Sequence, residues 1–367
     1  AVDEDEVFPW MGEQYSVRDI RERLISGMSA PRPKPVGPRL SDLKPQFVRL
    51  PAMPMWPTIH GRHTVGLGQV SFQFEDSGIL LSTRDFMAWY DAKSPGQPVW
   101  NDLGSSPRRE RSRGRLGYCR PALHDGMIYT RPVFYRDRHY LVAIDVETRQ
   151  IQWGLDAAGP ANARIKIPLG NPVLSQGKLY TASCWAPHGG PGALRLRLMC
   201  VEAATGDVIW KSDTEMQSDE KGLTGVVGDV LTVHDGEIYC TPGAEELFRF
   251  DARDGALEWT HLYPKKQGKR QQQWGTLGSA PVIVGDAVVC LPRDTDILIG
   301  LDRRTGNPLC RSSLLLPSMI LGAHEECVVV QGRAVLASVH VKSGEVKWMV
   351  PVSGHLLGLS VLLGDSV

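Results

Sequence analysis

Short apolar runs separated by Gly- or Asp-containing turns recur along most of the chain. Residues 120–130, 171–181, 230–240 and 280–290 each contain an apolar run, a tight turn and a second apolar run, as in RPALHDGMIYT. Such runs are typical of β-strands, and Gly accepts the positive φ that a tight hairpin turn requires. The pattern therefore predicts a series of β-hairpins.

A second kind of hairpin alternates with the first. It has an apolar strand, an acidic residue, a turn that often contains Thr-Gly or Ser-Gly, and a short strand that carries Trp. It occupies residues 86–100, 140–153, 197–210, 247–259, 297–310 and 335–348. The aromatic position holds Trp100, Trp153, Trp210, Trp259 and Trp348, with Cys310 in the fifth unit. Four short strands in every ~40 to 55 residues are typical of one antiparallel β-propeller blade, and we expect each Trp to pack between neighbouring blades.

The recurring ending Asp-x-x-Thr-Gly-x-x-x-Trp resembles the pyrroloquinoline-quinone-type propeller repeat, from about residue 69 to the end of the chain. The family includes quinoprotein dehydrogenases and a non-catalytic outer-membrane assembly lipoprotein, and the chain resembles the second type more. The dehydrogenases carry two adjacent cysteines under the quinone and a Glu, Asn and Asp set on calcium. This chain has no adjacent cysteines, and no matching positions for the calcium ligands are found. The resemblance thus implies the fold, and no quinone or calcium is expected.

The expected fold is an all-β propeller of four-stranded antiparallel blades. Residues 58–367 contain six full blades, and residues 358–367 match the start of a seventh. The resemblance implies a ring that closes with seven or eight blades. We expect either a longer protein or another chain to supply the missing strands, because an open ring exposes a strand edge. Residues 1–57 are expected to form a short helix over 17–25 and a Pro-rich arm on the propeller, or alternatively a disordered linker.

Charge and hydropathy narrow the function classes. The 41 Lys and Arg balance the 41 Asp and Glu, so the net charge is zero, which argues against a nucleic-acid partner. No apolar run is long enough for a transmembrane helix. The chain starts at Ala1 with an acidic segment, which fits a processed, exported protein or a trimmed chain. We expect a periplasmic or extracellular location.

Loop length differs between the two faces of the predicted propeller. Turns between the first and second and between the third and fourth strands of a blade are short, whereas the loops on the other face are long and charged. These long loops are either merely solvated or bind a protein partner or an anionic ligand. The candidate binding residues on this long-loop face are Arg108, Arg109, Arg111, Arg113, Arg115, Trp185, His188, Lys265, Lys266, Lys269, Arg270 and Trp274.

Residues with metal or catalytic chemistry form no strong motif. The spacings of His60 with His63 and of Cys184 with His188 suit a metal, but neither pair comes with a second cluster. Two of the seven cysteines, Cys240 and Cys290, lie in apolar runs. We interpret them as small buried side chains. We expect no catalytic or metal site. The predicted function is an exported, non-enzymatic scaffold or interaction module, with a quinoprotein-like dehydrogenase and a subunit of a larger assembly as alternatives.

Overall fold

The described part of the chain is built from β-strands and turns. The computed structural model describes residues 7–10, 13–16, 71–75, 77–83, 86–91, 99–102, 121–131, 140–156, 160, 163, 165–187, 194–216, 229–243, 245–264, 279–292, 295, 297–313, 317–332 and 335–351. None of these residues is helical, and so none lies in a helix that could cross a membrane. The helix expected over 17–25, the Pro-rich arm and the start of a seventh blade lie outside the described residues.

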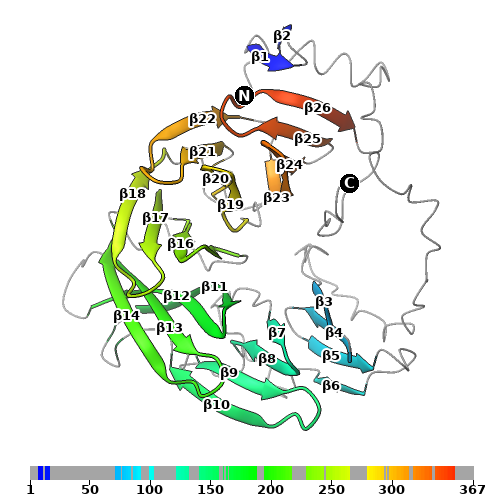
Figure 1. The fold of residues 1–367 in the computed structure, drawn as a ribbon, viewed down its shortest axis with the longest axis vertical. Helices are drawn as coiled ribbons and strands as arrows, with labels where there is room; N and C mark the ends of the chain where they lie inside the picture. The colour runs from blue at the N-terminus through cyan, green and yellow to red at the C-terminus, as the bar shows by residue number, and fades with distance from the viewer. Residues whose placement is uncertain are drawn as a thin grey trace, which may run out of the picture. The chain divides into compact units, whose positions relative to one another are not determined.

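Strands β3 to β26 form antiparallel sheets in which neighbours in sequence are neighbours in space (Figure 1). Five described sheets have four strands, and the sixth has six. The first three are β3 (Ser71–Glu75), β4 (Gly78–Thr83), β5 (Phe86–Asp91) and β6 (Trp100–Asp102); β7 (Ala122–His124), β8 (Met127–Thr130), β9 (Tyr140–Asp145) and β10 (Ile151–Asp156); and β11 (Ile165–Ser175), β12 (Lys178–Ala186), β13 (Arg195–Glu202) and β14 (Val208–Glu215).

The other three sheets follow the same order along the chain. They are β15 (Leu231–His234), β16 (Glu237–Cys240), β17 (Glu246–Asp251) and β18 (Leu257–Leu262); β19 (Val282–Val284), β20 (Ala287–Cys290), β21 (Leu298–Asp302) and β22 (Pro308–Ser312); and β23 (Pro317–His324), β24 (Cys327–Gly332), β25 (Val335–His340) and β26 (Val346–Pro351). This architecture confirms the predicted all-β fold with four-stranded antiparallel blades. The blade total stays a prediction.

The strands belong to two compact units. One contains residues 45–258 and 357–359, and the other contains residues 1–44, 259–356 and 360–367. In the first unit, the largest apolar cluster joins β11–β14 to β15–β17, with Phe248 and Phe250 fully buried in it. Cys240 is also in this cluster with no exposed surface, as predicted. In the second unit, the cluster joins β19–β21 to β23–β26, and Cys290 is likewise fully buried.

Positive-φ residues form the short turns that the sequence predicts. In the His-Asp-Gly turn after β7, Asp125 has φ 49° and Gly126 has φ 70°. The turn after β15 repeats this, with φ 49° at Asp235 and 77° at Gly236. Two successive positive φ values are the signature of a type I′ turn, whose twist matches that of the flanking strands.

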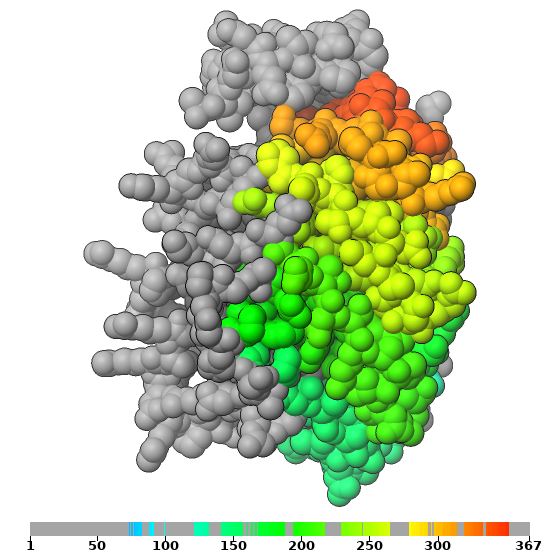
Figure 2. Space-filling view, turned by 90° about the vertical axis from the view of Figure 1, so that its left-hand side faces the viewer, coloured from blue at the N-terminus to red at the C-terminus, as the bar shows by residue number. Residues whose placement is uncertain are grey.

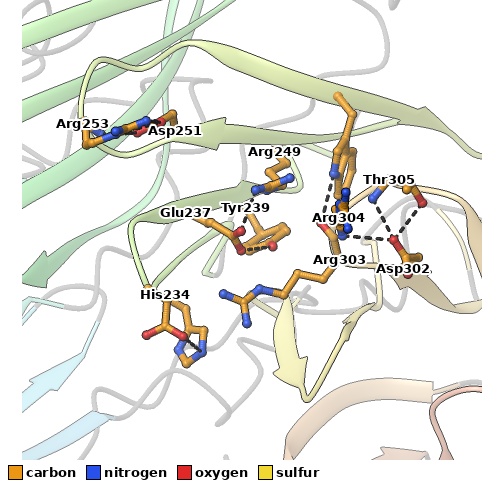
Figure 3. A network of polar contacts seen from close by, with 12 residues as sticks. His234, Glu237, Tyr239, Arg249, Asp251, Arg253, Asp302, Arg303, Arg304 and Thr305 are labelled. Atoms are coloured by element: carbon orange, nitrogen blue, oxygen red, sulfur yellow. Dashed lines mark hydrogen bonds and ion pairs between the residues drawn. The ribbon is translucent and has the colours of Figure 1, made fainter.

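An Asp side chain organises the turn between the third and fourth strands. Asp145 accepts hydrogen bonds at Oδ1 from the backbone N–H and the hydroxyl of Thr148, at 2.7 and 2.9 Å. Asp302 and Thr305 repeat this arrangement (Figure 3). Because these hydrogen bonds favour the charged carboxylate, they lower the pKa of Asp145 and Asp302. In the sixth blade His340 takes the acidic position, and its Nδ1 lies 3.0 Å from the Ser343 hydroxyl.

Three Trp residues of this repeat, Trp153, Trp210 and Trp259, contact the turn of the following blade. The Trp153 indole donates from Nε1 to the Ala203 carbonyl at 3.0 Å. A Cβ added at Gly206 would lie 2.6 Å from the Trp153 ring, so only Gly allows the ring to pack there. The other pairs with this geometry are Trp210 with Gly255 and Trp259 with Gly306. This confirms the predicted packing of Trp between blades.

The N-terminal residues form a hairpin that the sequence did not predict. Strands β1 (Val7–Trp10) and β2 (Glu13–Ser16) pair antiparallel. Strand β1 also pairs in parallel with β26, with Trp10 in register with Val346. The sixth sheet therefore has the order β2-β1-β26-β25-β24-β23. The outermost strand of this blade, β26, therefore pairs with β1, a strand of the same unit.

Candidate functional site

The blade formed by β11–β14 has the longest strands of its unit. They have 11, 9, 8 and 8 residues, whereas β7–β10 have three to six. The added residues lie at the end where β12 leads into β13. Trp185 was predicted to lie on a long loop, and this is wrong because residues 182–186 belong to a strand. They extend β12, because they pair with β11 on one side and with β13 on the other.

Trp185 lies on this extension and faces two arginines of β13. The register places Arg195 opposite Trp185, and Arg197 is two residues further along the same face. The two guanidinium carbons lie 5.5 and 5.7 Å from the centre of the indole ring, within range of a cation–π interaction. The Trp185 side chain is consequently well covered, with 8% of its surface exposed.

Two carboxylates of β14 hold these arginines in place. Asp213 accepts hydrogen bonds from Nε and Nη2 of Arg197 at 2.9 and 2.6 Å, and from Nε1 of Trp185 at 2.9 Å. Arg195 pairs with Glu215 at 2.8 Å. Burial alone would raise the pKa of Asp213, but hydrogen bonds from Arg197 and Trp185 and the positive charge of both arginines lower it below its ordinary value. Asp213 therefore stays ionised at neutral pH.

We call Trp185, Arg195, Arg197, Asp213 and Glu215 the Trp–Arg platform. The opposite face of the same strands packs into the apolar cluster of this unit, with Cys184 and Leu196 fully buried. The platform is therefore an ordered arrangement on a rigid sheet. Its most accessible groups are the Arg195 and Glu215 side chains, with 41% and 72% of their surface exposed.

Of the residues predicted for the long-loop face, the structure describes only Trp185. The others lie outside the described residues: Arg108, Arg109, Arg111, Arg113, Arg115, His188, Lys265, Lys266, Lys269, Arg270 and Trp274. Their participation stays a prediction. Sequence reasoning missed Arg195, Arg197, Asp213 and Glu215, although β13 and β14 carry opposite charges at alternate positions, as cross-strand ion pairs require.

A second polar network lies within the β15–β18 blade (Figure 3). The fully buried Tyr239 donates its hydroxyl to Glu237 at 2.5 Å, and Arg249 donates from Nη2 to Glu237 at 2.6 Å. Tyr239 and Arg249 are opposite each other on β16 and β17. Because each charge is matched and largely buried, this network supports the blade and offers little accessible surface to a ligand.

Among the described residues, no quinone and calcium site of the dehydrogenase kind is found. The sequence has no adjacent cysteines, and the six described cysteines are free thiols. Within the described part of the chain, no three His, Cys, Asp or Glu side chains lie where they could share a metal ion. Cys184 is fully buried, and its expected companion His188 is outside the described residues. The expectation that no cofactor binds stays a prediction.

Comparison with known proteins identifies relatives of the fold. A family model described as outer membrane protein assembly factor BamB matches residues 137–319. The solved structure of BamB from Moraxella catarrhalis superposes with a TM-score of 0.54 at 15% identity, covering 81% of this chain and 77% of that chain. Quinohemoprotein alcohol dehydrogenase from Comamonas testosteroni superposes with a TM-score of 0.56 at 12% identity, covering 80% and 61%. The chain thus spans less than two thirds of the dehydrogenase. No curated protein sequence matches the chain significantly.

Proposed function

Because this chain is a β-propeller repeat protein of the pyrroloquinoline-quinone type, we propose that it serves as a non-enzymatic scaffold that binds a protein partner through the Trp–Arg platform. The family description, an outer membrane assembly factor, supports a role in bringing proteins together. It also supports a location in the periplasm or at the outer membrane. A partner chain that completes the propeller belongs to the same proposal.

The observation that carries the proposal is the order within the platform. Trp185 is fixed by a hydrogen bond to Asp213 and by two stacked guanidinium groups. Trp and Arg dominate the energetic centres of protein interfaces, and side chains that are already ordered lose little entropy on binding. The platform thus has the composition and the rigidity of a binding hot spot.

The charge balance of the platform favours a protein over a free anion. Arg197 is matched by Asp213 and Arg195 by Glu215, so the arginines have little net attraction for a small anion. A protein surface can instead present opposite charges to both members of each pair. We therefore propose a partner with mixed charges around an apolar centre.

Photocrosslinking in the cells of origin tests this proposal. A benzoylphenylalanine placed at Glu215, the most exposed platform residue, is expected to trap a discrete protein. With that protein purified, Arg197→Ala should weaken binding by about tenfold or more, because it removes both hydrogen bonds to Asp213 and one cation–π contact. Binding is measured by isothermal titration calorimetry.

Two matched controls separate the platform from the rest of the surface. Benzoylphenylalanine at Glu147, an exposed residue of the β9–β10 turn, should trap nothing. Arg253→Ala, which removes an Arg–Asp pair in another turn, should leave the affinity unchanged. Equal trapping at both positions, or an equal loss of affinity in both arginine variants, would show that the platform is not the binding site.

A test for enzymatic function complements this experiment. We expect saturating pyrroloquinoline quinone with calcium to leave the melting temperature of the purified protein unchanged. A ligand that binds only the folded state raises the melting temperature, so an unchanged value means that the quinone does not bind. A clear rise, or quinone-dependent oxidation of an alcohol, would replace the scaffold proposal with a dehydrogenase.

A further inference from the structure

The charged side chains of the Trp–Arg platform lie in two columns. Strand β13 carries Arg195 and Arg197, and β14 carries Glu215 and Asp213 opposite them in register. Side chains at alternate positions of a strand share one face of the sheet, so a column of two cations stands beside a column of two anions. Strand β14 ends its described sheet, and Figure 2 faces the side on which this strand, in green, lies at the surface. The two columns thus belong to the outer part of the blade.

This arrangement differs from the other ion pairs between described residues. Arg249 and Glu237 form a single pair inside the β15–β18 blade, where both side chains are largely buried. Arg253 and Asp251 are two residues apart in one turn. Among the described residues, only the platform has two ion pairs side by side that join the same two strands with the charges in the same order.

A two-fold axis parallel to the strands matches this pattern with itself. An axis placed between β13 and β14 lays the cationic column of one copy over the anionic column of a second copy. Arg195 of each copy then faces Glu215 of the other, and Arg197 faces Asp213. Two sheets that pack face to face lie about 10 Å apart, a gap that an Arg and a Glu side chain span together. Two-fold dimers are the commonest protein oligomers, and every contact occurs twice in them.

We propose that the partner of the Trp–Arg platform is a second copy of this chain, related to the first by this two-fold axis. The inference rests on the proposed function and names the partner of the same site. Arg195 and Glu215 make the main contact, because 41% and 72% of their side-chain surface is exposed. Arg197 and Asp213, with 14% and 30% exposed, flank it. Trp185 supports Arg195 from below and keeps it ordered, which limits the entropy lost on association.

Charge reversal on each side of the axis tests this proposal. We expect the full-length chain to sediment as a dimer. Arg195→Glu and Glu215→Arg should each weaken self-association by about tenfold or more, because each places two like-charge contacts in the interface. Sedimentation equilibrium over a range of concentrations measures the dissociation constant.

An equimolar mixture of the two variants should recover the dimer. In a mixed dimer, position 195 of each chain again faces the opposite charge at position 215 of the other chain. Within each chain, these two positions carry like charges, so the ion pair that the structure shows stays broken. Only a contact between two chains therefore explains the recovery. Förster transfer between differently labelled variants detects the mixed dimer specifically.

Controls separate this contact from general charge effects. A mixture of Arg195→Glu with Glu258→Arg, an exposed residue of β18, has the same net charges and should associate more weakly than the first mixture. Lys211→Ala should dimerise normally, because Lys211 pairs with Met199 and so faces no charge across the axis. A cooperative melting transition shows that each single variant is folded.

The outcomes distinguish this inference from the proposed function. A chain that stays monomeric at all concentrations, single variants that dimerise like the wild type, or a mixture that does not recover would each overturn the inference. If the chain is monomeric and the crosslinker at Glu215 traps a different protein, the proposed function stands without it. An adduct of two copies of the chain at Glu215 supports both.

Discussion

Glycines with nearly the same backbone conformation differ in what surrounds them. Gly206 has φ +79° and Gly236 has φ +77°. A Cβ at Gly206 would lie 2.6 Å from the Trp153 ring, whereas a Cβ at Gly236 would meet nothing within 4 Å. We expect Gly236→Ala to cost about 1–2 kcal/mol from backbone strain alone. Gly206→Ala should cost about 1–3 kcal/mol more, because the indole must move. Urea unfolding of both variants measures the difference.

Equal destabilisation of Gly206→Ala and Gly236→Ala would mean that the indole adjusts without cost. The contact at Gly206 would then not require Gly.

The sequence predicts the Gly-containing turns from Thr-Gly and Asp-Gly pairs. It does not reveal which Gly supports a Trp, because the ring comes from a blade about 50 residues away. Arg149 illustrates the limit: it occupies the position of Gly206 in the preceding blade and adopts φ 62°.

At the scale of elements, Trp153, Trp210 and Trp259 each combine a large apolar ring with one hydrogen bond to the following blade. Trp210 donates from Nε1 to the Ala252 carbonyl of the following blade at 3.1 Å. We expect Trp210→Phe to cost about 1 kcal/mol, the net value of one hydrogen bond. Trp210→Ala should cost about 3 kcal/mol or more, since it also leaves a cavity. If urea unfolded both variants equally easily, the hydrogen bond and not the ring would stabilise the contact between Trp210 and the following blade.

The hairpins of the blades could be predicted because their apolar runs and turns repeat. The extension of β12 could not, because its residues, Ala-Ser-Cys-Trp-Ala, lack the β-branched residues that mark strands and precede a Gly- and Pro-rich run. The strand is set by its partners: Lys166 on β11 and Arg195 on β13 both pair with Trp185. The cross-strand arrangement of the platform follows from this pairing, which spacing along one strand does not show.

At the scale of the whole molecule, the recurring Trp predicted the succession of blades correctly. The pairing of β1 with β26 joins residues more than 300 positions apart and follows no repeat. Strand pairing between such distant segments depends on which edge remains open once the blades have formed. A single sequence therefore predicts the repeating unit better than the way in which a terminal segment completes it.

Protonation equilibria across the molecule make its stability depend on pH in two windows. Burial, helped by the positive charge of Arg311, lowers the pKa of His261 below its ordinary value of 6.5. The unfolded chain then binds a proton that the folded chain does not, so stability declines as the pH falls below about 6.5. His261→Gln should flatten this first decline, measured as the free energy of unfolding in urea between pH 7 and pH 5. An unchanged slope would show that His261 is not its origin.

The second window comes from the Asp side chains of the turns. Hydrogen bonds from Arg253 lower the pKa of Asp251 to about 2, and Thr148 and Thr305 lower those of Asp145 and Asp302. A lowered folded pKa stabilises the protein above the unfolded value of about 3.8, and this stability is lost as the pH falls through the folded value. We expect steep destabilisation below about pH 4. The combined Asp→Asn variant at the three positions should be less stable at pH 7 and show a shallower acid slope. An acid slope equal to that of the wild type would place its origin outside these turns.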